Sequence, residues 1–275
     1  MQFEKWQALG NDYLILEEAE LTPRQIQLLC DPHFGPGADG VLVLTKPDEP
    51  GYVARLRIFN PDGSEAELSG NGAREAILYL RRSGWTDADT FSLQTLAGEI
   101  RPTITSPTTC KVDMGRAHLT SPNFPQGPAD GQGELEVDGQ TFRFQHVAIG
   151  NPQCAIRVPD PDALDLAKLG PHIENAPIFP NRTNVSFWHE VTSNTIRARI
   201  FERGVGETLS SGTGASGAAV AHVLRGGDSP VTVQLDGGEL VVDVDEALHV
   251  DLTGWAKPIY RGELSEEFTR DMEAE

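Results

Sequence analysis

The sequence is poor in cysteine, in basic residues and in long apolar runs, and each shortage excludes a class of protein. Its three cysteines, Cys30, Cys110 and Cys154, are an odd number, widely spaced and outside any C-x-x-C motif. They therefore predict neither a disulfide framework nor a metal site. The 22 lysines and arginines stand against 41 aspartates and glutamates, and the net charge of −19 disfavours nucleic acid and anionic membranes as partners.

No run approaches the roughly 20 apolar residues of a membrane span. The N-terminus, MQFEKWQALGND, has no basic segment followed by an apolar one. We therefore expect a cytoplasmic protein whose partner is a small molecule. The hydrophobic content of 39% is enough for ordinary globular cores.

The most informative feature is an internal repeat. Residues 58–76 (IFNPDGSEAELSGNGAREA) and 200–218 (IFERGVGETLSSGTGASGA) align without a gap at an offset of 142 (200 − 58), which pairs Ser69 with Ser211. A looser match pairs ALGN at 8–11 with AIGN at 148–151, at an offset of 140 (148 − 8). A repeat of about 140 residues is domain-sized. We predict two similar domains, 1–117 with the returning tail 257–275, and 118–256.

Short β-rich runs punctuated by Gly, Pro, Asn and Asp predict a mixed α/β (α+β) fold with mostly antiparallel sheet. Each half carries one strongly apolar helix, expected at 73–80 and at 215–224, which suits a buried position surrounded by sheet. Weaker helices are expected at 22–30 and 161–169. The segment 121–133, rich in Pro and Gly, is the expected linker between the halves.

Each copy of the repeat places a serine before a Gly-x-Gly turn and a helix. Unpaired N–H groups at a helix N-terminus attract anions, and glycines let a ligand approach the backbone closely. Two such sites would hold one carboxylate. Each serine alone is also what a helix N-cap requires, but a cap does not need the same Gly-x-Gly turn twice. GTGASG at 212–217 matches a dinucleotide-binding pattern, yet the segment ERGVGETLS at 202–210 stands between it and the preceding strand, which disfavours that interpretation.

Charged residues precede the second turn. Glu202 and Arg203 stand where the first copy has Asn60 and Pro61. An arginine can hold a carboxylate and a glutamate can hold an ammonium group, so the pair suits an amino acid.

At these positions the chain resembles the diaminopimelate epimerases, the pyridoxal-independent amino-acid racemases of lysine and peptidoglycan synthesis. The resemblance covers nearly the whole chain. Its motifs are GADG at 37–40, N-x-DGS at 60–64, GNGAR at 70–74, GNP at 150–152, RTNV at 182–185 and ERGVGET at 202–208.

The resemblance implies two pseudo-symmetric domains, each a barrel-like sheet around a central helix, that close over substrate in the cleft between them. It implies a two-base transfer of the α-proton without a cofactor, a role in amino-acid biosynthesis, and a homodimer with Tyr260 at its interface. Glu202 and Gln153 would modulate the catalytic pair. The residues that would contact substrate are Asn11, Asn60, Gly70, Asn71, Asn151, Asn184, Glu202, Arg203, Gly212 and Thr213.

The departure lies at the chemistry. The family uses one cysteine on each face of the α-carbon, and here both corresponding positions are serine, Ser69 and Ser211. A position that is histidine in many members is Gln153. A serine hydroxyl is a much weaker acid than a thiol and needs a neighbouring base. No histidine lies in the matched motifs, although His146 or His172 could fold nearby.

Three hypotheses remain. The first, which we favour, is an isomerase that converts LL- to meso-diaminopimelate with a serine pair at reduced activity, helped by Glu202 or another base. The second is a non-catalytic amino-acid-binding homologue. The third is an epimerase engineered to carry the serines. The chain also departs from the family at Gln153 and at Glu75, where a cysteine is frequent in the family. These further changes favour a natural sequence over an engineered one.

Overall fold

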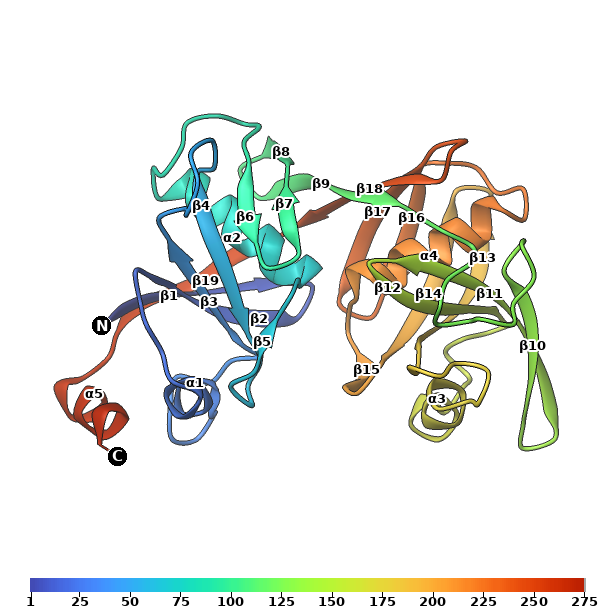
Figure 1. Ribbon diagram of the computed structural model, residues 1–275, viewed down its shortest axis with the longest axis horizontal. Coiled ribbons are helices and arrows are strands. Elements are labelled where there is room, and N and C mark those ends of the chain that lie inside the picture. The colour runs from blue at the N-terminus through green and yellow to red at the C-terminus, as the bar shows by residue number, and fades with distance from the viewer. Residues whose placement is uncertain (275) are drawn as a thin grey trace. The chain divides into compact units, whose positions relative to one another are not determined.

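The computed structural model describes residues 1–274, which form two compact units. Unit 1 consists of Met1–Val112 and Gly254–Glu275, and unit 2 of Asp113–Thr253. Each unit is a sheet-rich α+β body with few helices, and the C-terminal strand β19 and helix α5 of unit 1 are drawn in red in Figure 1. None of the helices described is long and apolar enough to cross a membrane.

The main sheet of unit 1 runs in the order β19-β1-β2-β3-β4-β6-β7, with β5 paired to β4. Its strands are β1 (Gln2–Ala8), β2 (Asn11–Glu17), β3 (Val41–Thr45), β4 (Ala54–Phe59), β5 (Glu65–Ala66), β6 (Leu93–Thr95), β7 (Gly98–Ile100) and β19 (Lys257–Glu263). The pairs β2–β3 and β4–β6 are parallel, because a helix connects each of them, and the other pairs are antiparallel. Since β19 and β7 are the two ends, this sheet does not close into a barrel.

Two helices connect the parallel strands of unit 1, one on each face of the sheet. Helix α1 (Pro23–Cys30) packs Ile26 and Leu29 against Leu14 and Leu16 of β2. Helix α2 (Gly70–Arg82) is buried from Asn71 to Leu80 and packs on β1 to β4. Side chains alternate between the faces of a strand, so the neighbours of Leu14 on β2 face α2.

The C-terminal tail completes unit 1. Strand β19 pairs antiparallel with β1, and α5 (Glu266–Glu273) lies beside α1. Unit 1 also contains β8 (Pro102–Ser106) and the first residues of β9 (Thr109–Arg116), which pair as a hairpin. The residues after Gly254 thus supply an edge strand that the first copy of the repeat does not contain.

Unit 2 repeats this topology. Its order is β10-β11-β12-β13-β14-β16-β17-β18, with β15 on β14, and the pairs bridged by helices, β12–β13 and β14–β16, are again parallel. The strands are β10 (Gln132–Val137), β11 (Gln140–Ile149), β12 (Asn151–Arg157), β13 (Asn184–Thr192), β14 (Thr195–Glu202), β15 (Gly206–Thr208), β16 (Val231–Leu235), β17 (Gly238–Val244) and β18 (His249–Trp255). The connecting helices are α3 (Leu166–Glu174) and α4 (Gly212–Val223).

The helix predictions at 22–30, 73–80 and 215–224 are confirmed as α1, α2 and α4. The prediction at 161–169 is wrong in its start, because Pro161 to Leu164 form a turn and Asp165 caps the helix by accepting from the Lys168 N–H at 3.2 Å. The predicted linker at 121–133 is also wrong. It lies inside unit 2, where the Gly131 carbonyl accepts from the His146 N–H at 2.7 Å and β10 begins at Gln132.

One buried acid in unit 1 gives the fold a pH dependence. Glu75 of α2 is fully buried, and burial raises the pKa of its carboxyl well above the usual range, although the charge of Arg74 opposes this shift. In the unfolded chain Glu75 ionises near its ordinary pKa of about 4.3. Above that pH the folded state binds more protons than the unfolded state, so this group's contribution to stability is present below about pH 4.3 and is lost as pH rises toward the folded pKa.

We therefore expect Glu75→Gln to be more stable than the unaltered protein, by a margin that grows by up to about 1.4 kcal/mol for each pH unit between pH 5 and 7. Urea unfolding at several pH values measures this. Glu20→Gln, at an exposed glutamate, is the control. A margin for Glu75→Gln that is independent of pH would show that Glu75 ionises alike in both states.

Candidate functional site

The residues around the two repeated serines form two half-sites, one in each unit. The first half-site comprises Asn11, Tyr13, Asp39, Ser69, Gly70 and Asn71. The second half-site comprises Asn151, Gln153, Asn184, Glu202, Arg203, Ser211, Gly212 and Thr213. Each is described within its own unit.

In the first half-site Ser69 is the N-cap of α2. Its Oγ accepts a hydrogen bond from the Gly72 N–H at 3.1 Å and a second from the Tyr13 hydroxyl, also at 3.1 Å. Gly70 is the first residue of the helix. Backbone N–H groups of this first turn have no partner within the helix, so they favour an anion there.

A chain of amides extends from the same turn. Asn71 donates from Nδ2 to Asn11 Oδ1 at 3.2 Å, and Asn11 donates from Nδ2 to Asp39 Oδ2 at 2.9 Å. Asn71 Oδ1 also accepts from Arg74, which is fully buried and donates to the Gly70 carbonyl at 2.9 Å. The predicted substrate residues Asn11, Gly70 and Asn71 are thus held together with Ser69.

Asn60 lies apart from this chain. It is exposed, and its Nδ2 donates to Ser64 Oγ at 3.0 Å in the turn between β4 and β5. That hairpin is fixed by Arg57, whose guanidinium bonds both oxygens of Glu65 at 2.9 and 2.8 Å. Nothing in residues 1–112 links Asn60 to Ser69 by a hydrogen bond.

The second half-site repeats the geometry of the first. Ser211 is the N-cap of α4 and its Oγ accepts from the Gly214 N–H at 3.2 Å, while Gly212 begins the helix. Asn151 donates from Nδ2 to Thr213 Oγ1 at 3.2 Å, as the aligned residues Asn11 and Asn71 also bond to each other. The two copies of the repeat therefore join the same pair of positions, although the donor is Asn71 in the first and Asn151 in the second.

Glu202 at the end of β14 is the acidic group of this half-site. Burial raises its pKa above the usual range, and hydrogen bonds from Ser211 and Thr208 oppose the shift. A carboxyl with a raised pKa that is bonded to a hydroxyl is suited to accept or return a proton. Ser211 therefore has a neighbouring base, which the sequence motifs suggested only as a possibility.

Arg203 and Asn184 are held together by the backbone. The Arg203 N–H donates to Asn184 Oδ1 at 2.8 Å, and Asn184 Nδ2 donates to the Pro152 carbonyl at 3.1 Å. The Arg203 guanidinium donates from Nη1 to the Asn181 carbonyl at 3.0 Å. The remaining N–H groups of this guanidinium are suited to bind a carboxylate ligand.

Gln153 is fully buried on β12. It donates from Nε2 to Asn151 Oδ1 at 2.5 Å and packs against Gly217 of α4, where an added Cβ would lie 2.8 Å from its own Cβ. Its Oε1 is buried without a hydrogen-bond partner in residues 1–274. Gln153 thus positions Asn151 rather than bonding to Ser211.

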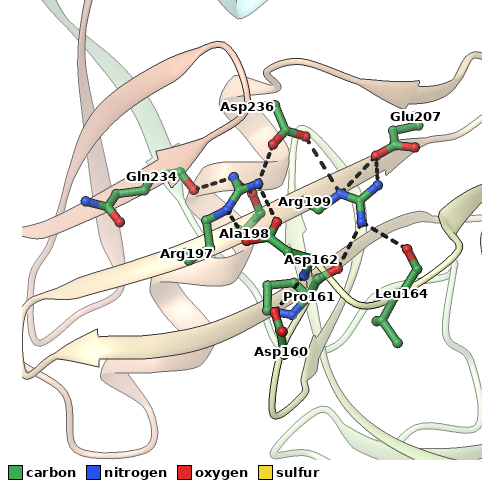
Figure 2. A network of polar contacts seen from close by, with 10 residues as sticks. All are labelled: Asp160, Pro161, Asp162, Leu164, Arg197, Ala198, Arg199, Glu207, Gln234 and Asp236. Carbon is green, nitrogen blue, oxygen red and sulfur yellow. Dashed lines mark hydrogen bonds and ion pairs between the residues drawn. The ribbon is translucent and has the colours of Figure 1, made fainter.

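A network of ion pairs surrounds β14, the strand that ends at Glu202 (Figure 2). Arg199 of β14 bonds Glu207 of β15 and donates to the Pro161 and Leu164 carbonyls at 3.0 and 2.9 Å. Arg197 bonds Asp162 at 2.6 Å and also Asp236. The pair Arg199–Glu207 occupies the repeat positions of Arg57–Glu65, so the same clamp fixes the hairpin before each serine.

Neither the cysteines nor the histidines supply a substitute catalyst. All three cysteines are free and buried, and burial raises the thiol pKa to about 12 for Cys30 and Cys110 and well above its usual value for Cys154. His146 Nε2 bonds to Ser121 Oγ at 2.9 Å, and burial lowers its pKa to about 4. Within residues 1–274 no histidine bonds to either serine.

One group of side chains has the composition of a metal site. Asp113, His249 and Asp251 place their ligand atoms within 4.8 Å of one another, and His249 Nε2 bonds to Asp113 Oδ1 at 2.8 Å. None of these residues belongs to either half-site.

Sequence reasoning missed Tyr13, Asp39 and Arg74. The repeat held a signal for the first of them, because Tyr13 aligns with Gln153 at the offset of 140 (153 − 13). Tyr260, which the resemblance places at a dimer interface, is exposed on β19. Its ring packs edge-on against that of Phe3, with 5.9 Å between the ring centres.

Comparison with known proteins identifies close relatives. A family model described as diaminopimelate epimerase matches residues 3–120 and 146–257. The diaminopimelate epimerase of Pelotomaculum thermopropionicum is 41% identical over 277 residues, which cover 96% of this chain and 98% of that protein. Diaminopimelate epimerase 1 of Nostoc sp. is 40% identical, with 96% and 99% covered.

More distant likenesses concern the fold alone. A probable proline racemase from Agrobacterium radiobacter K84 superimposes with a TM-score of 0.69 at 15% identity, covering 96% of this chain and 93% of that one. A hydroxyproline epimerase from Agrobacterium vitis gives a TM-score of 0.65 at 14% identity, with 95% and 91% covered.

Proposed function

Because this chain belongs to the diaminopimelate epimerase family, we propose that it is a cofactor-independent isomerase that converts LL-diaminopimelate to the meso form in lysine and peptidoglycan biosynthesis. The observation that carries the proposal is the doubled half-site. Each unit places a serine hydroxyl at a helix N-cap beside the same amide contact.

The half-sites divide the recognition of an amino acid between them. The N–H groups at Gly70–Asn71 and Gly212–Thr213 would bind the α-carboxylate. Glu202 would attract the α-ammonium, and Arg203 would bind a carboxylate, with Asn11, Asn60, Asn151 and Asn184 orienting the rest of the substrate. These contacts place charge where the α-carbanion develops, which lowers the barrier to removing the α-proton.

The two serines would act on opposite faces of one α-carbon. In one direction Ser211 Oγ takes the α-proton while its own hydroxyl proton passes to Glu202, and Ser69 gives its hydroxyl proton to the other face. In the reverse direction the roles exchange. Each turnover moves one proton onto the substrate and one off it, so no oxidant or cofactor is consumed.

The test is incubation of the purified protein with LL-diaminopimelate, without added pyridoxal phosphate, followed by chiral separation of the isomers. We expect meso-diaminopimelate to accumulate until the two forms reach equilibrium. The competing function is binding without turnover, which the absence of a catalytic thiol favours. Saturable binding by calorimetry with no meso form would support that alternative and contradict ours.

We further propose that the protein acts in the cytoplasm as a homodimer. Its free cysteines suit a reducing compartment. Strand β19 is an end strand of its sheet with Ile259 and Tyr260 exposed, and an open edge with apolar side chains favours pairing with a second copy. Sedimentation velocity on the unaltered protein and on Tyr260→Ala tests this, and a monomer in both cases would contradict it.

A further inference from the structure

The hydrogen bond from Tyr13 to Ser69 has no counterpart in the second half-site. Tyr13 and Gln153 occupy equivalent places, since each is the third residue of its strand and faces the central helix of its unit. Gln153 bonds to Asn151, whereas the Tyr13 hydroxyl bonds to the serine Oγ itself at 3.1 Å. The two serines therefore have different partners, a phenol in unit 1 and the Glu202 carboxyl in unit 2.

Two glycines, Gly40 and Gly72, leave space for the Tyr13 ring. Tyr13 is 6% exposed. A Cβ on Gly40 would lie 2.5 Å from its Cε1, and one on Gly72 would lie 3.4 Å from its Cε2. The ring is thus held between the start of β3 and the first turn of α2, and this packing fixes the direction of its hydroxyl toward Ser69.

The bond also sets the direction of the Ser69 proton. Ser69 Oγ accepts from both Tyr13 and the Gly72 N–H. A hydroxyl has two acceptor positions and one donor. With both acceptor positions filled, the Ser69 O–H points away from Tyr13 and Gly72. In this orientation Ser69 can donate its proton to a substrate.

Resting on the proposed function, we propose that Tyr13 is the proton partner of Ser69, so that the pair acts as a relay on one face of the α-carbon. As the Ser69 O–H bond breaks and its proton joins the α-carbanion, the Tyr13 O–H bond breaks and its proton moves to Ser69 Oγ. The electron pair of the carbanion becomes the new C–H bond, and the negative charge ends on the Tyr13 phenolate. In the reverse direction the phenolate accepts the proton that Ser69 passes on.

The advantage of the relay is chemical. A phenol ionises near pH 10 in free tyrosine, far more readily than an aliphatic hydroxyl, and each pKa unit is worth about a factor of ten. The relay lets Ser69 deliver its proton without itself carrying the alkoxide charge. Tyr13 acts through Ser69 and is therefore a positioning residue rather than a catalytic one.

Tyr13→Phe is the first test, with Tyr79→Phe as the matched control. Tyr79 is also buried in unit 1, but its hydroxyl bonds to Glu17 at 2.8 Å, away from both half-sites. We expect Tyr13→Phe to lower kcat at least about tenfold, with KM changed less than about twofold. The alkaline limb of the pH profile of kcat should disappear, and 3,5-difluorotyrosine at position 13 should move it to lower pH. Tyr79→Phe should keep both kcat and the limb.

A thiol provides the decisive background. A cysteine at position 69 ionises without help, so in Ser69→Cys the further change Tyr13→Phe should lower kcat less than about twofold. An equal loss in both backgrounds would mark a structural role and overturn the relay. An unaltered protein that forms no meso-diaminopimelate would overturn the proposed function, and the relay with it. An active unaltered protein whose kcat is left unchanged by Tyr13→Phe would overturn the relay alone.

Discussion

Replacing Ser69 and Ser211 together by cysteine is expected to raise kcat for LL-diaminopimelate at least about 100-fold. A thiol has a pKa near 8.5, and a helix N-terminus lowers it further, whereas a serine must borrow a partner's acidity. Both positions are N-caps whose Oγ atoms accept an N–H from the first turn, so a thiolate there would be stabilised. Each pKa unit of better matching is worth about tenfold in rate.

The comparison is of steady-state kinetics for the unaltered protein, each single variant and the double variant. Ser83→Cys is the control, because Ser83 is the C-cap of α2 and the opposite end of the same helix does not favour a thiolate. It should leave kcat unchanged. A double variant no faster than the unaltered protein would show that positions 69 and 211 do not reach the reacting carbon.

The second large effect is expected at Arg203. Arg203→Ala should weaken diaminopimelate binding by roughly 10- to 100-fold, since a hydrogen bond to a charged group contributes about 1.5–3 kcal/mol. Arg203→Lys should recover only part of the affinity, because an ammonium lacks the planar donor pair. Isothermal calorimetry measures both changes.

Arg143→Ala is the matched control for charge. Arg143 also lies in unit 2 and bonds an acid, Glu134 at 2.7 Å, but its side chain is 85% exposed. It should bind diaminopimelate as the unaltered protein does. If Arg203→Ala and Arg143→Ala bound alike, Arg203 would have no part in carboxylate recognition.

The repeat in the sequence predicts most of the architecture. The offset of 142 pairs Ser69 with Ser211 and also Arg57 with Arg199. In the structure both serines accept from the N–H three residues further on, and both arginines bond the glutamate eight residues further on. The strength of this signal comes from chemistry, because a Gly-x-Gly turn at a helix start and an arginine–glutamate clamp both require particular residues at fixed spacing.

What could not be predicted depends on packing across strands. The bond between Tyr13 and Ser69 joins residues 56 positions apart, and only the register of β2 against α2 brings them together. The burial of Arg74 and Glu75 contradicts what their polarity suggests, since charged residues are almost never fully buried without partners. The segment 121–133 has the Pro- and Gly-rich composition of a linker, but its Gly131 carbonyl accepts a hydrogen bond from His146 of β11 in the same unit.

The most direct test of the central claim is α-proton exchange by the unaltered protein. LL-diaminopimelate is incubated with it in D₂O, and proton NMR follows the α-hydrogen signals while chiral separation follows the meso form. We expect deuterium to enter the α-carbon as meso-diaminopimelate forms, which requires an acid and a base at the paired serines. Saturable binding of diaminopimelate with no deuterium at the α-carbon would contradict it.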